Sequence, residues 1–396
     1  MRIFFSTGDF VYAYRPRPGF PLILNDDMTP AEPFHSYLLW LLLERGKALD
    51  LKTWESYGRV MWDFAQYLYA NHFAWNQSYA SKGESVITVY RDWQTFDLKL
   101  DPSTINRRIR QICGFYRWAL GRGMIHEVPF SSTKVTTEGV PHDSSHVTGG
   151  GQAGDKPNLI LDEWDKEPVF LTAAQANLAR AAIRSIAHRL LFDLMARVGL
   201  RAIEARTFPL AAVFDPATRP HLKPGTMIRV FLDPQQMDIK LDKPRWVDVP
   251  HSLMEEMYAY AQFERNRHVV ATRQQRTLLL TSCGNAYSKG SAHKVMTDLG
   301  LKVGFRIAPL MLRHSYAVHT LLLLRESQSK IRLDPLIYLR NQLGHRSVLT
   351  TQLYLDQIER ITGPEALALV GEFDNLYQST AALFATYPNE AVPIAE

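Results

Sequence analysis

The stretch that decides the fold is LGHRSVLTTQLYLD at residues 343–356, together with LRHSY at residues 312–316 upstream of it. Gly344 permits a tight left-handed turn, and the serine and threonines that follow are residue types that cap helices, so a short helix is expected to carry Tyr354. A single tyrosine on a helix usually belongs to a core or an interface, and an Arg-His pair is usually solvated. Only the combination of phenol, imidazole and guanidinium therefore indicates a site.

These segments resemble the closing motifs of the tyrosine recombinases, or phage-type integrases. The resemblance rests on LRHSYA at residues 312–317 and on LGH followed by TTQ.Y, which hold an arginine, a histidine and a tyrosine in the family's order. A third segment, GLRAIE at residues 199–204, is similar to the GLRxxE motif of the family. The resemblance implies a site-specific DNA recombinase that cuts and rejoins strands through a 3′-phosphotyrosyl intermediate, independently of metal ions and ATP.

Such a transesterification needs a nucleophile, cations at the phosphate oxygens and an acid for the departing 5′ oxygen. Arginine suits the cationic role, because its guanidinium donates two parallel hydrogen bonds and keeps its proton. The resemblance assigns this role to Arg201 and Arg313, the nucleophile to Tyr354, and a hydrogen bond to the phosphate to His345. Glu204 follows Arg201 by one helical turn and is expected to orient its guanidinium.

The acid in this family is a lysine on a β-hairpin between the two arginines. Matching KPRWV at residues 243–247 to the family pattern assigns the acid to Lys240, with Lys243 as the alternative because hairpin loops vary in length. A hairpin lysine is most often a plain surface charge. Its place between the arginine motifs is what supports a catalytic role.

The sequence departs from the family at Leu310, which stands where the motif H-x-x-R has its histidine. Leucine cannot accept a proton, and general acid–base catalysis contributes about a hundred- to ten-thousand-fold. Arg306 and His314 are the candidates for compensation. No P-loop or carboxylate cluster of the Mg²⁺-binding type is evident, so no cofactor and no metal site is expected.

The composition is that of an ordinary globular protein, with 46% hydrophobic and 21% charged residues among 396. This length suffices for two domains that each bury a core. The net charge of +5 permits a nucleic-acid partner without requiring one. Cys113 and Cys283 lie outside metal-ligand spacing, which argues against a zinc site or disulfide framework. Since no signal peptide or membrane-length apolar run is evident, we expect a cytoplasmic protein. The resemblance implies that it is bacterial and nucleoid-associated.

Hydrophobic periodicity predicts a mainly α fold with a small antiparallel β-sheet in the second of two domains. The resemblance implies that the first is a small helical core-binding domain and the second an α-rich catalytic domain. The expected helices lie at 32–45, 51–72, 102–124, from 172, and at 183–198, 252–265, 288–299, 310–325 and 335–342. The expected strands lie at 227–232, 237–241 and 245–249. The predicted organisation is an N-terminal arm (1–30), the core-binding domain (31–130), a linker (131–170), the catalytic domain (171–360) and a C-terminal helix and tail (361–396).

One predicted helix carries a basic face. Asp101 and the proline after it are a helix-start pair, and Arg107, Arg110 and Arg117 fall opposite the apolar side of the helix that follows. A solvated surface is one interpretation of this face. A surface that follows DNA phosphates is the other, and the resemblance favours it because the segment looks like the last helix of the family's core-binding domain.

The expected partner is double-stranded DNA carrying recombination sites, bound by a homo-tetramer, for a mobile genetic element. Two interpretations stay open for the amphipathic segment at 364–384: packing on its own domain, or docking on a neighbouring copy. Two other functions are also open. One is a recombinase-derived DNA-binding protein whose catalysis is weakened by Leu310, and the other is a type IB topoisomerase.

Overall fold

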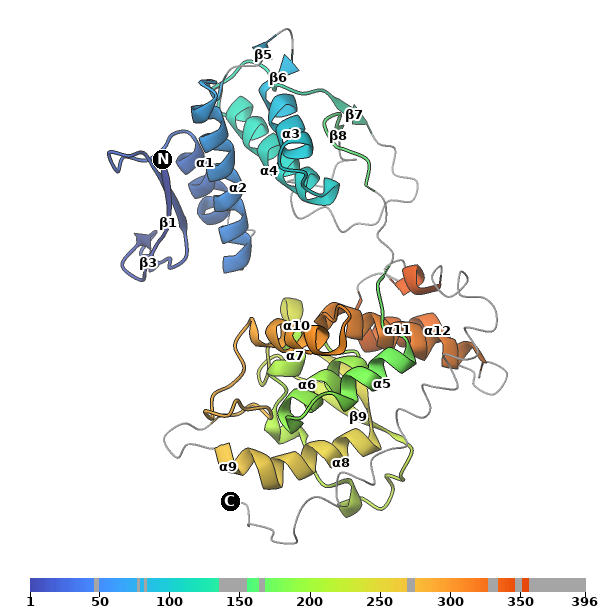
Figure 1. Ribbon diagram of the computed structural model, residues 1–396. Helices are drawn as coiled ribbons and strands as arrows, with labels where there is room; N and C mark the ends of the chain where they lie inside the picture. Colours follow the sequence, from blue (N-terminus) through green and yellow to red (C-terminus); the bar gives the residue numbers. More distant parts are fainter. Residues whose placement is uncertain are drawn as a thin grey trace. The chain divides into compact units, whose positions relative to one another are not determined.

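The computed structural model describes residues 1–45, 50–76, 79–81, 84–134, 155–163, 168–268, 275–326, 334–345 and 351–355. The chain divides into two units, Met1–Asp165 and Lys166–Glu396. Both are mainly helical and carry only two-stranded antiparallel sheets in the described ranges, which confirms the predicted fold class (Figure 1). The predicted C-terminal helix at 364–384 and most of the predicted linker lie outside the described residues. None of the helices in the described part of the chain has the length and apolarity needed to cross a lipid bilayer.

The first unit contains four strands, a group of helices and two further pairs of short strands. Its elements are β1 (Arg2–Phe5), β2 (Val11–Tyr12), β3 (Arg15–Pro16), β4 (Pro21–Leu24), α1 (Phe34–Leu38), the π-helix η1 (Leu39–Glu44), α2 (Leu51–Ala70), β5 (Tyr79–Ser81), β6 (Glu84–Ser85), α3 (Val86–Phe96), α4 (Pro102–Gly121), β7 (Ser132–Lys134) and β8 (Asp155–Pro157).

Helices α2, α3 and α4 form the centre of this unit, because the apolar face of each is turned towards the others. Asp101 caps α4, accepting a hydrogen bond from the Ser103 amide at 3.1 Å, with proline in the first turn as predicted. Aromatic rings fill the core, and Phe34 stacks on Phe115 with centroids 5.1 Å apart. Helix α3, which was not predicted, is capped by Ser85.

The N-terminal residues differ from the predicted extended arm. Strand β1 pairs with β4 in antiparallel register, and both strands pack on α2 (Figure 1). Phe20 and Ile23 are completely buried in the core of the unit. The segment is thus an integral part of the first unit, held there by burial of its apolar side chains.

The predicted linker also contributes to the first unit. Strand β7 pairs with β8, and Leu159 is buried in the same core. Asn106 on α4 holds the following segment, since its side chain exchanges two hydrogen bonds with the backbone of Leu161, each 2.8 Å long. Glu163 lies next to it and pairs with Arg110.

The second unit is built around one central helix. Its elements are α5 (Ala173–Ala181), α6 (Ile186–Ala196), α7 (Ala202–Arg206), the 3-10 helices η3 (Leu210–Ala212), η4 (Pro216–Thr218) and η5 (Lys240–Asp242), β9 (Met227–Leu232), β10 (Arg245–Pro250), α8 (His251–Ala259), the π-helix η6 (Tyr260–Arg265), α9 (Asn266–His268), α10 (Ser291–Val303), α11 (Pro309–Glu326) and α12 (Pro335–Leu343). Residues 351–355 are also helical.

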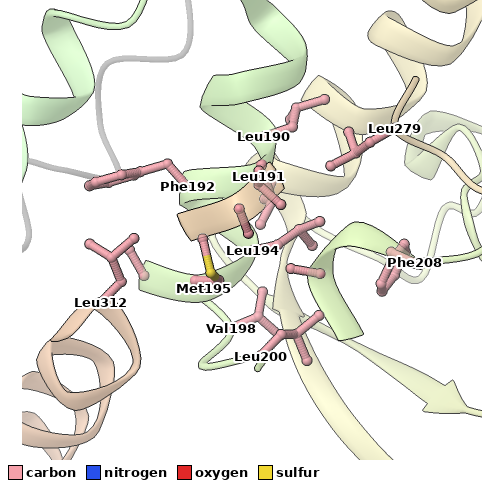
Figure 2. Close-up of a cluster of buried hydrophobic side chains, with 14 of the residues drawn as sticks. Leu190, Leu191, Phe192, Leu194, Met195, Val198, Leu200, Phe208, Leu279 and Leu312 are labelled. Atoms are coloured by element: carbon pink, nitrogen blue, oxygen red, sulfur yellow. The ribbon is translucent and has the colours of Figure 1, made fainter. Parts of the chain in front are cut away.

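Helix α6 is the centre of this unit, and α5, α8, α10 and α11 surround it. Its leucines meet Leu200, Phe208 and Leu312 from neighbouring segments in one buried cluster (Figure 2). Strands β9 and β10 form the predicted hairpin, with Val247 opposite Val230. The predicted strand at 237–241 is wrong. Met237 and Ile239 are buried alternately, but their segment has no strand partner and ends in η5.

Four charged residues of α5, α8 and α6 with its C-cap are buried together and pair with one another. Asp193 on α6 accepts two hydrogen bonds from the Nε of Arg180, at 2.9 and 3.0 Å, and Glu256 on α8 bridges Arg180 and Arg197. The four side chains are between 0% and 13% exposed. The network therefore joins α5, α6 and α8 through charges that have little contact with water.

We expect Asp193→Ala to lower the free energy of unfolding by about 3–5 kcal/mol, because it leaves a buried guanidinium without its main partner. Urea unfolding followed by circular dichroism measures the loss. Arg229→Ala is the control in the same unit: this side chain is 70% exposed and its pair with Asp248 is 3.6 Å long, so the expected loss is at most about 1 kcal/mol. Similar losses in the two variants would show that the buried network stabilises the fold no more than an exposed ion pair does.

Candidate active site

The first arginine of the site follows a glycine turn at the end of α6. Gly199 has φ of +72°, and a Cβ there would lie 2.3 Å from Cδ1 of Tyr316. No other residue type fits this backbone and this contact. The flanking Val198 and Leu200 are completely buried, so the turn is fixed to the core and Arg201 stands at the start of α7.

Glu204 connects two of the arginines of the site. Its carboxylate accepts hydrogen bonds from the backbone amide and the guanidinium of Arg201, at 2.8 and 3.1 Å. The same carboxylate accepts two bonds from the guanidinium of Arg245 on β10, at 2.9 and 2.7 Å. Burial alone would raise the pKa of Glu204, but the bonds and charges of Arg245 and Arg201 hold this pKa below its ordinary value.

Arg313 lies on α11, directly after the buried Leu312, and is itself only 4% exposed. Its guanidinium donates to the carbonyl of Gly199 at 2.6 Å and to the carbonyl of Leu343 at the end of α12. Burial and the nearby charge of Arg201 lower the pKa of Arg313 to about 9. The side chain therefore joins three segments while keeping its charge at neutral pH.

His345 follows the left-handed turn that ends α12. Gly344 has φ of +64°, and a Cβ there would lie 2.9 Å from Cδ of Arg245, so glycine is required. Nδ1 of His345 is 3.0 Å from the hydroxyl of the buried Thr351. Burial and the charges of Arg313 and Arg201 lower the pKa of His345 to about 3, so the imidazole is neutral at pH 7.

Tyr354 is 3% exposed and packs in an apolar cluster formed mainly by α11 and α12. The ring of His345 is parallel to the tyrosine ring, with centroids 6.3 Å apart and 15° between the planes. The hydroxyl of Tyr354 lies 2.8 Å from Nδ1 of His314 on α11. Burial raises the pKa of the phenol, whereas Arg313 and Arg201 act in the opposite direction.

The site carries an excess of positive charge. Among the described residues around it, three guanidiniums belong to Arg201, Arg245 and Arg313, whereas Glu204 supplies one carboxylate, and both histidines are neutral. Two positive charges are thus left in a mostly buried place. Such an arrangement favours an anion, and most of all one whose negative charge increases during a reaction.

Comparisons with known proteins agree with this geometry at the level of the fold. No protein-family model matches the sequence, and no curated protein matches it either. Among solved structures, the chain is similar to the XerH site-specific recombinase bound to a palindromic difH substrate, with a TM-score of 0.52 and 18% identity over 82% of this chain and 83% of that one. The Tn1549 transposon integrase in complex with transposon right end DNA gives a TM-score of 0.51 and 14% identity over 81% and 97%. The chain has the tyrosine recombinase fold.

Within this fold, the structure brings together most of the residues that the sequence motifs singled out. Six of them lie in one neighbourhood of the second unit: Arg201, Glu204, Arg313, His314, His345 and Tyr354. Lys240 and Lys243 lie exposed in and just after η5, on the connection between β9 and β10. No hydrogen bond or ion pair in the described part of the chain joins either lysine to the site.

The three arginines of the basic helix face lie in the first unit. Arg107 is exposed on α4, Arg110 pairs with Glu163 at 3.1 Å, and Arg117 lies over the ring of Phe130 at 5.2 Å. Two of the three therefore have partners within the unit. Leu310 is 60% exposed in the first turn of α11.

Sequence reasoning did not assign Arg245 or Thr351 to the site. Arg245 belongs to the KPRWV segment at residues 243–247, whose match to the family pattern concerned only the catalytic lysine. The residues next to an arginine at the start of a strand do not indicate that it pairs with a buried carboxylate. A signal could have come from Glu204, since a glutamate that the fold buries needs more positive charge than the single, partly exposed Arg201 supplies. The described residues contain no group of three or more His, Cys, Asp or Glu side chains that could hold a metal ion.

Gly199→Ala is expected to destabilise the second unit by about 2–5 kcal/mol, because it adds the overlap with Tyr316 to the cost of a left-handed alanine. Gly304→Ala is the matched control, since Gly304 has φ of +83° and nothing within 4 Å of an added Cβ. It should cost only about 1 kcal/mol. Urea midpoints of the two variants measure the difference, and equal losses would mean that the contact with Tyr316 is unimportant.

The buried histidines predict a pH dependence of stability. An unfolded histidine takes up a proton near pH 6.5, whereas folded His345 stays neutral down to about pH 3. Its contribution to stability is complete above pH 6.5 and is lost as the pH falls towards 3. Between pH 7 and pH 5, the wild-type protein should therefore lose more unfolding free energy than His345→Gln, as measured by urea unfolding. Equal losses would contradict the lowered pKa.

Proposed function

We propose that the chain is a site-specific DNA recombinase or integrase that cuts and rejoins strands through a 3′-phosphotyrosyl intermediate. The observation that carries the proposal is the convergence of Arg201, Arg313, His345 and Tyr354 from distant segments of the sequence around a single phenol. The similar XerH and Tn1549 structures are both complexes with DNA. A mostly buried site with excess positive charge and a tyrosine suits a phosphodiester better than a neutral substrate.

In the proposed reaction, Oη of Tyr354 attacks the phosphorus of a DNA strand and the bond from phosphorus to the 5′ oxygen breaks. Arg201 and Arg313 donate hydrogen bonds to the nonbridging oxygens, on which negative charge builds up. Nδ1 of His345 is engaged by Thr351, so its Nε2–H is the group that donates to a phosphate oxygen. Lys240, or Lys243 in its place, protonates the departing 5′ oxygen, and religation reverses these steps.

The division into two units suits a protein in which a core-binding domain and a catalytic domain each contact the DNA. We assign the core-binding role to the first unit and its phosphate contacts to Arg107, Arg110 and Arg117. A homo-tetramer on two recombination sites, with residues 361–396 as the link between copies, belongs to the same proposal. So do a role in a mobile genetic element and a location at the bacterial nucleoid.

A second function is favoured by one specific observation. Leu310 occupies the position of the family's histidine and is exposed, so it supplies no acid–base group. A recombinase-derived protein that binds DNA without cutting it would tolerate such a leucine. The two functions differ in whether a covalent bond to DNA forms at Tyr354.

Covalent capture in cells separates these functions. Wild-type protein and Tyr354→Phe are expressed in a bacterium, the cells are lysed under denaturing conditions, and DNA that stays attached to the protein is sequenced. We expect attached DNA from the wild type, with the protein on 3′ ends that share a common sequence, and none from Tyr354→Phe. Tyr338→Phe is the control, because this phenol lies in the same unit but donates to Asp248 at 2.8 Å. It should keep the attached DNA.

Three outcomes would contradict the proposal. Wild-type protein that retains DNA only under native conditions would indicate binding without cleavage. Attached ends without a common sequence, together with relaxation of supercoiled plasmid, would indicate a topoisomerase. Attached DNA from Tyr354→Phe would remove Tyr354 as the nucleophile.

A further inference from the structure

His314 makes the hydrogen bond to the hydroxyl of Tyr354. Its Nδ1 lies 2.8 Å from Oη, and the two ring centroids are 5.6 Å apart. In the described part of the chain, no other hydrogen bond to this hydroxyl is present. The oxygen that would attack phosphorus is thus already in contact with a group that can accept its proton.

We propose that His314 is the catalytic base of this chain, taking the phenolic proton of Tyr354 in place of the histidine that the family carries at the position of Leu310. This inference rests on the proposed function and deepens it. It concerns the same reaction and adds a residue to which that function gave no role.

The geometry of α11 explains how a base at residue 314 can replace a base at residue 310. Residues 310 and 314 are four positions apart, so their side chains lie one above the other on the same face, with Cβ atoms about 5–6 Å apart. Leu310 is 60% exposed in the first turn, whereas His314 is partly buried one turn further on, against Tyr354. A base placed one turn later on this face therefore still reaches the same phenol.

The other polar groups of the site are poorly placed for this role. His345 turns its ring face towards the tyrosine ring and uses Nδ1 for Thr351. The guanidiniums of Arg201 and Arg313 have no acceptor atom. Arg306, the other candidate from the sequence, is exposed, and its guanidinium also has no acceptor atom.

His314 is in the protonation state that a base needs. Burial and the charge of Arg313 lower its pKa to about 4, so it is neutral at pH 7. With the proton on Nε2, Nδ1 accepts from the hydroxyl of Tyr354. When a phosphate enters, its negative charge offsets the repulsion from Arg313 and raises the basicity of His314. The bond from Oη to phosphorus then forms as the proton moves to Nδ1, and the electrons of the broken bond leave with the 5′ oxygen, which Lys240, or Lys243 in its place, protonates.

The experiment uses a nicked duplex that carries the sequence recovered with the wild-type protein, and measures the rate at which the covalent adduct forms. His314→Gln should slow cleavage about a hundredfold or more. The exposed His293→Gln on α10 is the control and should cleave at the wild-type rate. Circular dichroism and DNA binding confirm that each variant is folded.

A second duplex, with sulfur in place of the bridging 5′ oxygen, distinguishes a base from an acid. A thiolate leaves without being protonated, so the sulfur substrate restores cleavage by a variant that lacks the acid, such as Lys240→Ala. It does not help a variant that lacks the base. We expect His314→Gln to stay slow on both duplexes, and restoration by sulfur would overturn the assignment.

The wild-type pH profile keeps the inference testable even if the variants fail to fold. With His314 as base, the wild-type rate should change little between pH 6 and pH 9. A tenfold rise per pH unit would mean that only ionised tyrosine reacts, and would overturn the inference. If wild-type protein forms no adduct, the proposed function fails and the inference fails with it. If His314→Gln cleaves as fast as the wild type, only the role of His314 fails.

Discussion

The site depends on the carboxylate of Glu204, which lies between the guanidiniums of Arg201 and Arg245. Without this negative charge, three arginines would stand close together in a place with little water, and their repulsion would force them apart. The carboxylate also holds neighbouring elements together. Through Arg245, which donates to the carbonyl of Gln342 at 3.1 Å, it connects α7, β10 and the end of α12. One side chain thus sets both the charge balance and the spacing of the segments that carry the site.

Each polar group of the site is attached to the core by a neighbouring apolar residue. Leu200 precedes Arg201, Leu312 precedes Arg313, and Leu343 precedes the turn to His345. All three leucines are completely buried. Figure 2 shows two of them in the same cluster as the leucines of α6. Because such a core is closely packed, a shift of any of these segments would open cavities or cause clashes. The rigidity of the site is therefore a property of the core beneath it.

The sequence was most informative where a residue acts through its near neighbours. The cap at Asp101, the helix start at residue 172, the glycine turn at 344 and the apolar faces of α2 and α4 are local features, and all of them are found in the structure. Interactions across the fold were not visible. The alternating apolar residues at 237 and 239 resembled a strand, because hydrophobic periodicity indicates which side of a segment is buried and not whether a partner strand exists. The contacts of Arg245 and His314 likewise depend on segments about 40 residues away in the sequence.

The same excess of positive charge that favours a phosphate also determines what the two histidines can do. Burial and the arginines keep both imidazoles neutral at pH 7, and a neutral imidazole has one nitrogen that donates and one that accepts. A protonated ring could only donate. His345 can therefore offer a proton to a phosphate oxygen while His314 accepts one from the phenol, although both rings stand in the same electrostatic field. Both rings direct Nδ1 to a hydroxyl, which belongs to Tyr354 for His314 and to Thr351 for His345. The opposite roles proposed for two identical side chains therefore follow from which hydroxyl each Nδ1 meets, and burial together with the arginines keeps a lone pair on each ring.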